Sequence, residues 1–132
     1  QKSKSFRLSK EGGDFFVEQY FDLTGKGKKK VNSNKADQYL QEFDLKIAEA
    51  IENNYTGRDS ILATVPFCKM EVKMSNQDVR RVSFYDIKSR YASGKLKSEG
   101  VERFLCLVEP EDDFMMVQLG VFKDILRPYD YF

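Results

Sequence analysis

Residues 103–121, which read RFLCLVEPEDDFMMVQLGV, contain the pattern that decides the fold class. Hydrophobic side chains occupy every position of 104–108, which indicates a strand covered on both faces. The acidic segment 109–113 predicts a turn, and hydrophobic residues then alternate from Met115 to Val121. Strand, turn and strand together predict an antiparallel hairpin.

Two more strands are expected before this hairpin, because hydrophobic residues again recur at every second position. Residues 68–74 alternate between hydrophobic and charged side chains, which predicts a half-buried strand. Residues 75–78 predict a turn. A second strand is expected over residues 79–91, where the apolar pair Phe84 and Tyr85 indicates a bulge.

A long helix is the main element expected in the first half of the chain. From residue 35 to about residue 54, apolar positions recur at steps of three and four, which predicts one amphipathic helix. Ser33 or Asn34 is expected to cap its N-terminus. An aromatic-rich run at 15–23 predicts a first strand, with a short helix as the alternative. Residues 24–34 predict a lysine-rich loop, and residues 1–13 are expected to form a flexible or edge segment. The aromatic residues of the tail, 123–132, are expected to seal the core.

These elements predict a single α+β domain over residues 1–132, with one long helix packed on a four- to five-stranded antiparallel sheet. The element order, β-α-β-β-β-β, resembles the cystatin-like arrangement and, more loosely, nuclear-transport-factor-2-like domains. The cystatin inhibitor loop follows the pattern Gln-x-Val-x-Gly. Here Gln77 and Val79 are followed by Arg81 where that pattern has glycine. The resemblance therefore concerns element order, and we infer no inhibitor function from it.

The composition excludes several kinds of catalytic site. The chain has no histidine, so no Ser-His-Asp triad, Cys-His pair or HExxH zinc site can form. Neither metal nor cofactor is expected. The net charge of +1 gives no general attraction to nucleic acid or to an anionic membrane. No apolar run approaches the ~20 residues that a membrane-spanning helix needs.

Cys68 and Cys106 both fall on apolar strand faces. If their strands are neighbours, they form a candidate disulfide worth on the order of 2–4 kcal/mol. The alternative is a pair of thiols that fill space in the core. The chain begins at Gln1, which we interpret as the product of processing, with a chosen boundary as the alternative. We therefore expect an extracytoplasmic protein, periplasmic or secreted, and keep the cytoplasm as the alternative.

The lysine-rich loop is the first candidate binding site. Lysines at a helix N-terminus attract phosphates, and exposed aromatic rings stack on bases. The residues of this candidate ligand- or nucleic-acid-binding site are Lys26, Lys28, Lys29, Lys30, Phe16 and Tyr20. The alternative interpretation is a solvated loop that keeps the protein soluble.

Asp59, Glu71 and Lys73 are the second candidate site. In outline they resemble the Asp…(Asp/Glu)-x-Lys signature of a large nuclease superfamily. In such a site two carboxylates hold a divalent metal and the lysine orients or activates water. The alternative is that these charges form ion pairs across neighbouring strands.

The interpretation that these observations favour is a non-catalytic binding or accessory domain. Its expected partner is a protein or a small ligand, held on the outer sheet face or in the concavity between helix and sheet. The outer face is expected to carry Lys69, Glu71, Lys73 and Tyr85. The alternatives are a metal-dependent nuclease, which would use the second candidate site, and a nucleic-acid-binding module, which would use the lysine loop.

Overall fold

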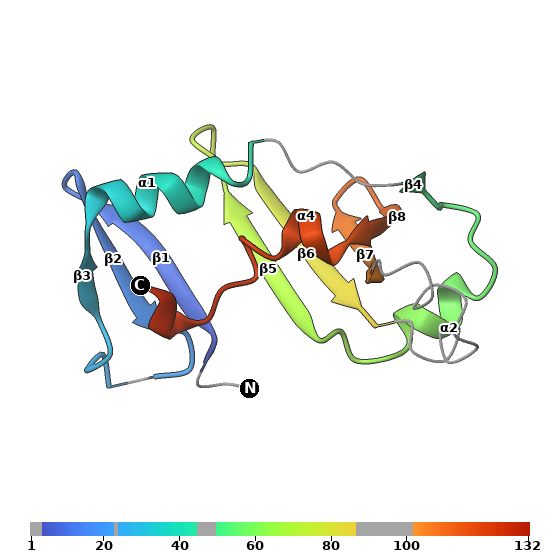
Figure 1. Cartoon of the computed structure of the whole chain (residues 1–132), viewed down its shortest axis with the longest axis horizontal. Coiled ribbons are helices and arrows are strands. Elements are labelled where there is room, and N and C mark those ends of the chain that lie inside the picture. The colour runs from blue at the N-terminus through green and yellow to red at the C-terminus, as the bar shows by residue number, and fades with distance from the viewer. Residues whose placement is uncertain (1–3, 23, 45–49, 87–101) are drawn as a thin grey trace. The chain divides into compact units, whose positions relative to one another are not determined.

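The computed structural model describes residues 4–22, 24–44, 50–86 and 102–132. The fold is α+β, with two antiparallel sheets in place of the single expected sheet, and its helices are short (Figure 1). The chain divides into two compact units: residues 1–46 together with 123–132, and residues 47–122. The second unit is thus inserted, in sequence, between two segments of the first. Among the described residues, no helix has the length and apolar character needed to cross a bilayer.

The first unit contains a three-stranded antiparallel sheet. Its strands are β1 (Phe6–Glu11), β2 (Asp14–Gln19) and β3 (Lys29–Val31), in that order. Gly12 and Gly13 join β1 to β2, and both have positive φ, as a two-residue hairpin turn that matches the strand twist requires. The expected first strand corresponds to β2, and the N-terminal segment forms the edge strand β1. The lysine-rich segment was expected to be loop throughout, but its last part pairs with β2 as β3.

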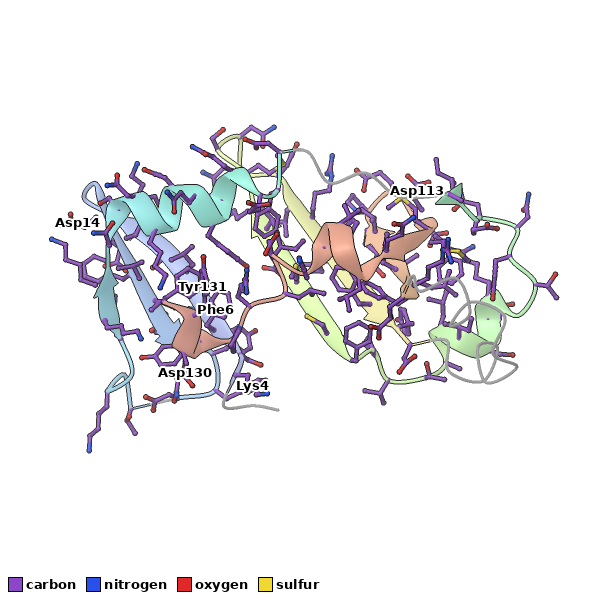
Figure 2. The ribbon with its side chains drawn as sticks, in the orientation of Figure 1. Lys4, Phe6, Asp14, Asp113, Asp130 and Tyr131 are labelled. Carbon is purple, nitrogen blue, oxygen red and sulfur yellow. The ribbon has the colours of Figure 1, made fainter. Side chains whose placement is uncertain are left out.

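One face of this sheet is covered by α1 (Ser33–Gln41) and by the C-terminal segment, which ends in the 3₁₀-helix η3 (Tyr129–Tyr131). The buried residues of this core are Phe15, Val17, Val31, Ala36 and Tyr129, with Phe6, Leu8 and Phe132 packed against them. Phe6 and Tyr131 lie on the covered side (Figure 2), and each is in ring contact with Tyr39. The Tyr39 hydroxyl donates to the Ile125 carbonyl at 2.9 Å, and the Tyr129 hydroxyl donates to the Gly27 carbonyl. The prediction that the tail seals the core is confirmed in this unit.

The long helix is the main correction to the sequence prediction. The helix α1 ends at Gln41, and the amides of the next three residues make i→i−3 turn bonds, up to Asp44. Residues 45–49 lie outside the described residues. Ala50 and Ile51, which were expected on the apolar stripe of the helix, form β4 (Ala50–Ile51) and pair with the last strand of the other sheet. Pairing with a distant segment therefore decides their conformation.

The N-cap of α1 also differs from the expected one. The Asn32 side chain accepts hydrogen bonds from the amides of Asn34 at 2.9 Å and Lys35 at 3.3 Å. This residue therefore occupies the cap position, one residue before the expected Ser33.

The second unit contains a five-stranded antiparallel sheet. Its strands, in order across the sheet, are β4, β8 (Asp113–Gln118), β7 (Arg103–Glu109), β6 (Val79–Tyr85) and β5 (Cys68–Lys73). The hairpins β5–β6 and β7–β8 are the two that the sequence predicts, with the expected turns. The strand β6 ends at Tyr85, and residues 87–91 of the strand expected over 79–91 lie outside the described residues. The alternation that extends past Gln118 belongs to the short helix α4 (Leu119–Phe122), so the last strand is shorter than expected.

The centre of this sheet is buried on both faces. One face carries a cluster of Tyr85, Leu105, Leu107 and Phe114, covered by Tyr55 and by residues of α2 (Arg58–Leu62). The other face carries Phe84, whose ring contacts those of Phe67, Phe104 and Phe122. The strand β6 pairs with β7 without interruption through Phe84 and Tyr85. Cover on both faces, and not the bulge expected in β6, therefore explains why two neighbouring aromatic residues are buried.

Candidate functional site

The segment between β2 and β3 is organised by the carboxylate of Asp22. This carboxylate accepts hydrogen bonds from the Thr24 hydroxyl at 2.6 Å, from the Thr24 amide at 2.9 Å and from the Gly27 amide at 3.0 Å. The hydrogen bond from the Thr24 hydroxyl, followed by those from the two amides, lowers the pKa of Asp22 below its ordinary value. An acidic residue therefore holds together a loop whose other prominent residues are lysines and glycines.

Two of the four loop lysines share a face with Phe16. Phe16 lies opposite Lys30 in the register of β2 and β3, on the face of the sheet that points away from the core. The ammonium nitrogen of Lys28 lies 5.2 Å from the centroid of the Phe16 ring. Tyr20, at the end of β2, is 55% exposed, and its ring lies 5.6 Å from the guanidinium carbon of Arg7. The structure thus brings part of the predicted site together on one surface.

The cations on this surface are neutralised by carboxylates. The guanidinium of Arg7 lies 3.5 Å from the carboxylate of Glu18. The ammonium groups of Lys28 and Lys30 lie 2.9 Å and 3.4 Å from the carboxylates of Glu11 and Asp14, respectively. The hydrogen bond to Glu11 is the main cause of a raised pKa for Lys28. Because three cations face three carboxylates, these residues contribute no net charge. A site for nucleic-acid phosphates needs a stripe of basic groups that are not already paired.

The other two lysines lie elsewhere in the unit. Lys29 pairs with Val17 and therefore lies on the core side of the sheet, where its ammonium nitrogen is 4.5 Å from the centroid of the Tyr129 ring. Lys26 is exposed in the loop, and its amide donates to the Thr24 hydroxyl at 3.3 Å. The four lysines therefore form no single patch. Nucleic-acid binding through this loop stays a prediction, and the charge arrangement does not favour it.

The three residues of the proposed nuclease site lie on two different elements. Asp59 is exposed in the first turn of α2, whereas Glu71 and Lys73 are exposed on β5. The Glu71 carboxylate lies 3.1 Å from the Arg81 guanidinium on the neighbouring strand. In the part of the chain that the structure describes, no group of three or more acidic or cysteine side chains is placed to hold a metal ion. The geometry favours the cross-strand ion pair that the sequence offers as the alternative, and metal-dependent cleavage stays a prediction.

Cys68 and Cys106 lie on the same face of the second sheet, but not on neighbouring strands. Phe84 is the register partner of both residues, so it lies between them. Two strand spacings amount to about 10 Å, whereas a disulfide needs Cα atoms less than about 7 Å apart. Both thiols are free, and burial raises the pKa of Cys68 and raises that of Cys106 to about 12. The candidate disulfide is therefore not formed, and the structure matches the alternative of two thiols that fill space.

The most distinctive exposed feature of the second unit is the outer edge of β5. In the register of β5 and β6, the Met74 amide donates to the Asp78 carbonyl at 2.8 Å. Bonded positions alternate along an antiparallel pair, so Cys68, Met70 and Val72 direct their amides and carbonyls toward β6. Lys69, Glu71 and Lys73 direct theirs away from the sheet. We call these outward backbone groups of Lys69, Glu71 and Lys73 the β5 edge.

No strand pairs with the β5 edge among the described residues, since β5 is the last strand of its sheet. The side chains of β5 alternate: those of Lys69, Glu71 and Lys73 are exposed, and those of Cys68, Met70 and Val72 are half-buried. Lys69 and Lys73 have no carboxylate within ion-pair distance in the described ranges.

Three large hydrophobic side chains are exposed immediately before and after β5. Val65 is 91% exposed, Phe67 53% and Met74 48%, and we call these three the flanking residues. By contrast, Tyr85, which was expected on the outer face, is buried under Tyr55 and α2. Sequence reasoning missed the flanking residues. Their signal was the presence of Val65 and Phe67 beside Pro66, directly before a strand with an alternating pattern.

Comparison of the chain with protein family models, with curated proteins and with solved structures gives no match. The function is therefore inferred from the geometry alone.

Proposed function

We propose that this chain is a non-catalytic binding domain that takes up an extended protein segment along the β5 edge. The observation that carries the proposal is a row of outward amides and carbonyls at Lys69, Glu71 and Lys73, with exposed hydrophobic side chains at both ends. An exposed edge strand is a template for one more strand. Proteins normally shorten or cover such edges, whereas β5 is a full-length strand, the first of a well-formed hairpin.

Strand addition would use two kinds of group on β5. The outward amides and carbonyls form main-chain hydrogen bonds, each worth about 0.5–1.5 kcal/mol net. The flanking residues provide apolar area, and burying a side chain such as Phe67 contributes about 1.5–3 kcal/mol. The half-buried side chains of Cys68, Met70 and Val72 extend an apolar surface up to the edge itself. The partner segment is therefore expected to alternate between apolar and polar residues.

The first unit supports a protein partner more than a small ligand. The concavity between helix and sheet was the expected place for a small ligand. In this unit the rings of Phe6 and Phe132 lie against Tyr39 of α1, with centroids 6.1 Å and 5.0 Å from the Tyr39 ring. Side chains of the protein itself thus occupy the space beneath α1.

An extracytoplasmic location remains part of the proposal.

The proposal is tested with a pair of variants at one position. Glu71→Pro removes the outward amide of the β5 edge and leaves the hydrogen bonds to β6 intact, since this amide takes no part in them. Glu71→Ala loses the same carboxylate and keeps the amide, so it is the matched control. Extended peptides selected from a random library on the intact wild-type chain are then measured against both variants.

The expected result is that selected peptides bind the wild type and Glu71→Ala with similar affinity, and Glu71→Pro at least about tenfold more weakly. A circular dichroism spectrum establishes that Glu71→Pro is folded, and Lys73→Pro at the strand end replaces it if it is not. Equal binding to the proline and alanine variants, or selection of no binding peptide, overturns the proposal.

A further inference from the structure

We infer that the natural occupant of the β5 edge is the same edge of a second copy of this chain, paired antiparallel about a twofold axis at Met70. This inference rests on the proposed function and names its partner. The carrying observation is that β5 is complementary to itself in one register, in hydrogen bonding, in charge and in the placement of its hydrophobic side chains.

Hydrogen bonding restricts the registers that are possible. Only Lys69, Glu71 and Lys73 direct their backbone groups outward, so the bonded pairs between two copies must join these positions. Two registers keep the pairing close to the middle of β5. One has its axis at Met70 and pairs Lys69 with Glu71 of the second copy. The other has its axis at Glu71.

Charge distinguishes these two registers. With the axis at Glu71, two glutamates face each other and Lys69 faces Lys73 of the second copy, so every charged pair is repulsive. With the axis at Met70, the symmetry places Lys69 opposite Glu71 of the second copy twice. Opposite charges directly across two strands stabilise a sheet, and like charges destabilise it.

The favoured register also continues an existing row of charges. Within one copy Arg81 lies between Glu109 on β7 and Glu71 on β5, and it pairs with Glu71 at 3.1 Å. Lys69 of the second copy would extend this row beyond Glu71. The charges would then alternate in sign across the joined sheets. Lys69 has no carboxylate partner in the described part of one copy, and it would acquire Glu71 of the second copy as its partner.

The hydrophobic side chains fit the same register. On the opposite face, Met70 meets Met70 of the second copy at the axis, and Cys68 faces Val72 of the second copy, so half-buried side chains cover one another. The ring of Phe67 lies on this same face, against Phe84 and Phe104, and comes beside Val72 of the second copy, next to Cys68. Met74 comes beside Pro66 of the second copy. Two of the three flanking residues are therefore covered.

A third register, with its axis at Val72, pairs Glu71 with Lys73 of the second copy and is also attractive in charge. It shifts Phe67 beyond the strand, opposite the turn at 75–78, and leaves that ring exposed. The register at Met70 is the one that satisfies charge and covers Phe67 together.

Charge reversal tests the inference directly. Sedimentation equilibrium of the intact chain is expected to show a monomer that doubles in mass as concentration rises. Lys69→Glu and Glu71→Lys are each expected to weaken the dimer at least about tenfold, because each creates two like-charge pairs. The double variant exchanges the two charges and is expected to restore the affinity to within a few-fold. Lys26→Glu, at an exposed loop position, controls for the change in net charge.

A crosslink tests the register. In a Cys68→Ser background, Met70→Cys is expected to give a covalent dimer under mild oxidation with oxidised glutathione. Residues directly opposite at a non-bonded position have Cα atoms about 4.5 Å apart, which suits a disulfide. Val72→Cys in the same background is expected to remain monomeric on a non-reducing gel. The reverse result supports the register at Val72 and overturns the one at Met70.

Failure of this inference is distinguishable from failure of the proposed function. A wild type that stays monomeric at every concentration, while its selected peptides still require the Glu71 amide, overturns the second copy as occupant and leaves the binding edge. A dimer that forms equally well with Glu71→Pro uses another surface, and it overturns the inference. If the double variant, which combines Lys69→Glu with Glu71→Lys, remains monomeric, the inference is also overturned.

Discussion

Replacing Phe84 by alanine is expected to destabilise the second unit strongly. Phe84 is fully buried in β6, and its ring centroid lies 5.5 Å from that of Phe104, 6.1 Å from Phe122 and 6.2 Å from Phe67. Phe84 also lies in β6, the strand to which β5 is paired. Its loss therefore affects the packing of the core and the support of the β5 edge at once.

The magnitude follows from burial. A fully buried phenylalanine that becomes alanine loses its transfer free energy and leaves a cavity, which together cost about 3–5 kcal/mol. Because small domains are stable by only about 5–15 kcal/mol, the variant loses a third or more of a typical total. Phe16→Ala is the matched control. That ring is half-buried on an outer face, and its contact with Lys28 is worth only about 0.5–1 kcal/mol.

The assay is urea unfolding followed by circular dichroism, with amide hydrogen exchange to assign the loss to β6 and β7. The expected order is a loss for Phe84→Ala at least twice that for Phe16→Ala, with faster exchange throughout the second sheet. A loss below about 1.5 kcal/mol, or one equal to that of the control, would refute the packing described for this core.

Three further outcomes follow from single contacts. Because burial raises the pKa of Cys106 to about 12, its thiol is expected to resist a thiol reagent at pH 8 until the chain is unfolded, and rapid labelling of the native protein would contradict this. The carboxyl of Asp22 is expected to titrate below 3.8 in an NMR experiment. The hydrogen bonds from the loop to the Asp22 carboxylate are then fully formed above pH 3.8, and they are lost as the pH falls through the lowered pKa. The NMR chemical shift of the Gly27 amide, which donates to this carboxylate, follows the change. Tyr39→Phe removes the donor to the Ile125 carbonyl and is expected to cost about 1–3 kcal/mol in urea unfolding, whereas a change under about 0.5 kcal/mol would show that water replaces the hydroxyl.

The hairpins were predictable from sequence because their determinants are local. Alternation over residues 68–74, the polar turn at 75–78 and the acidic turn at 109–113 all lie within the segments that they organise. The end of α1 was not predictable in this way. Ala50 and Ile51 fit the helical stripe, but their partners, Met115 and Met116, lie far along the chain.

The division of the strands into two sheets depends on the same kind of long-range pairing. The short strand β3 is an example, since a lysine-rich sequence has little intrinsic preference for strand and its conformation follows from pairing with β2. Once it forms, alternation separates Lys29 from Lys28 and Lys30. The predicted lysine site could therefore not be judged before the pairing was known.

The candidate binding edge was only half visible in the sequence. The alternation of β5 indicated which side chains are exposed, and Glu71 was singled out, although for metal binding and not for an ion pair with Arg81. That β5 is the last strand of its sheet is a property of topology, to which no local pattern points.

The most direct test of a binding edge on β5 is amide hydrogen exchange of the intact chain, measured by NMR at low and at high protein concentration. In dilute solution the amides of Lys69, Glu71 and Lys73 are expected to exchange rapidly, while those of Met70 and Val72 are protected by β6. At high concentration the amides of Lys69 and Glu71, which pair across the twofold axis, are expected to become protected, and with a selected peptide all three outward amides are expected to be protected. If these three amides are protected in a sample that sedimentation shows to be monomeric and that holds no peptide, the edge is already covered within one chain, and the account of its function is contradicted.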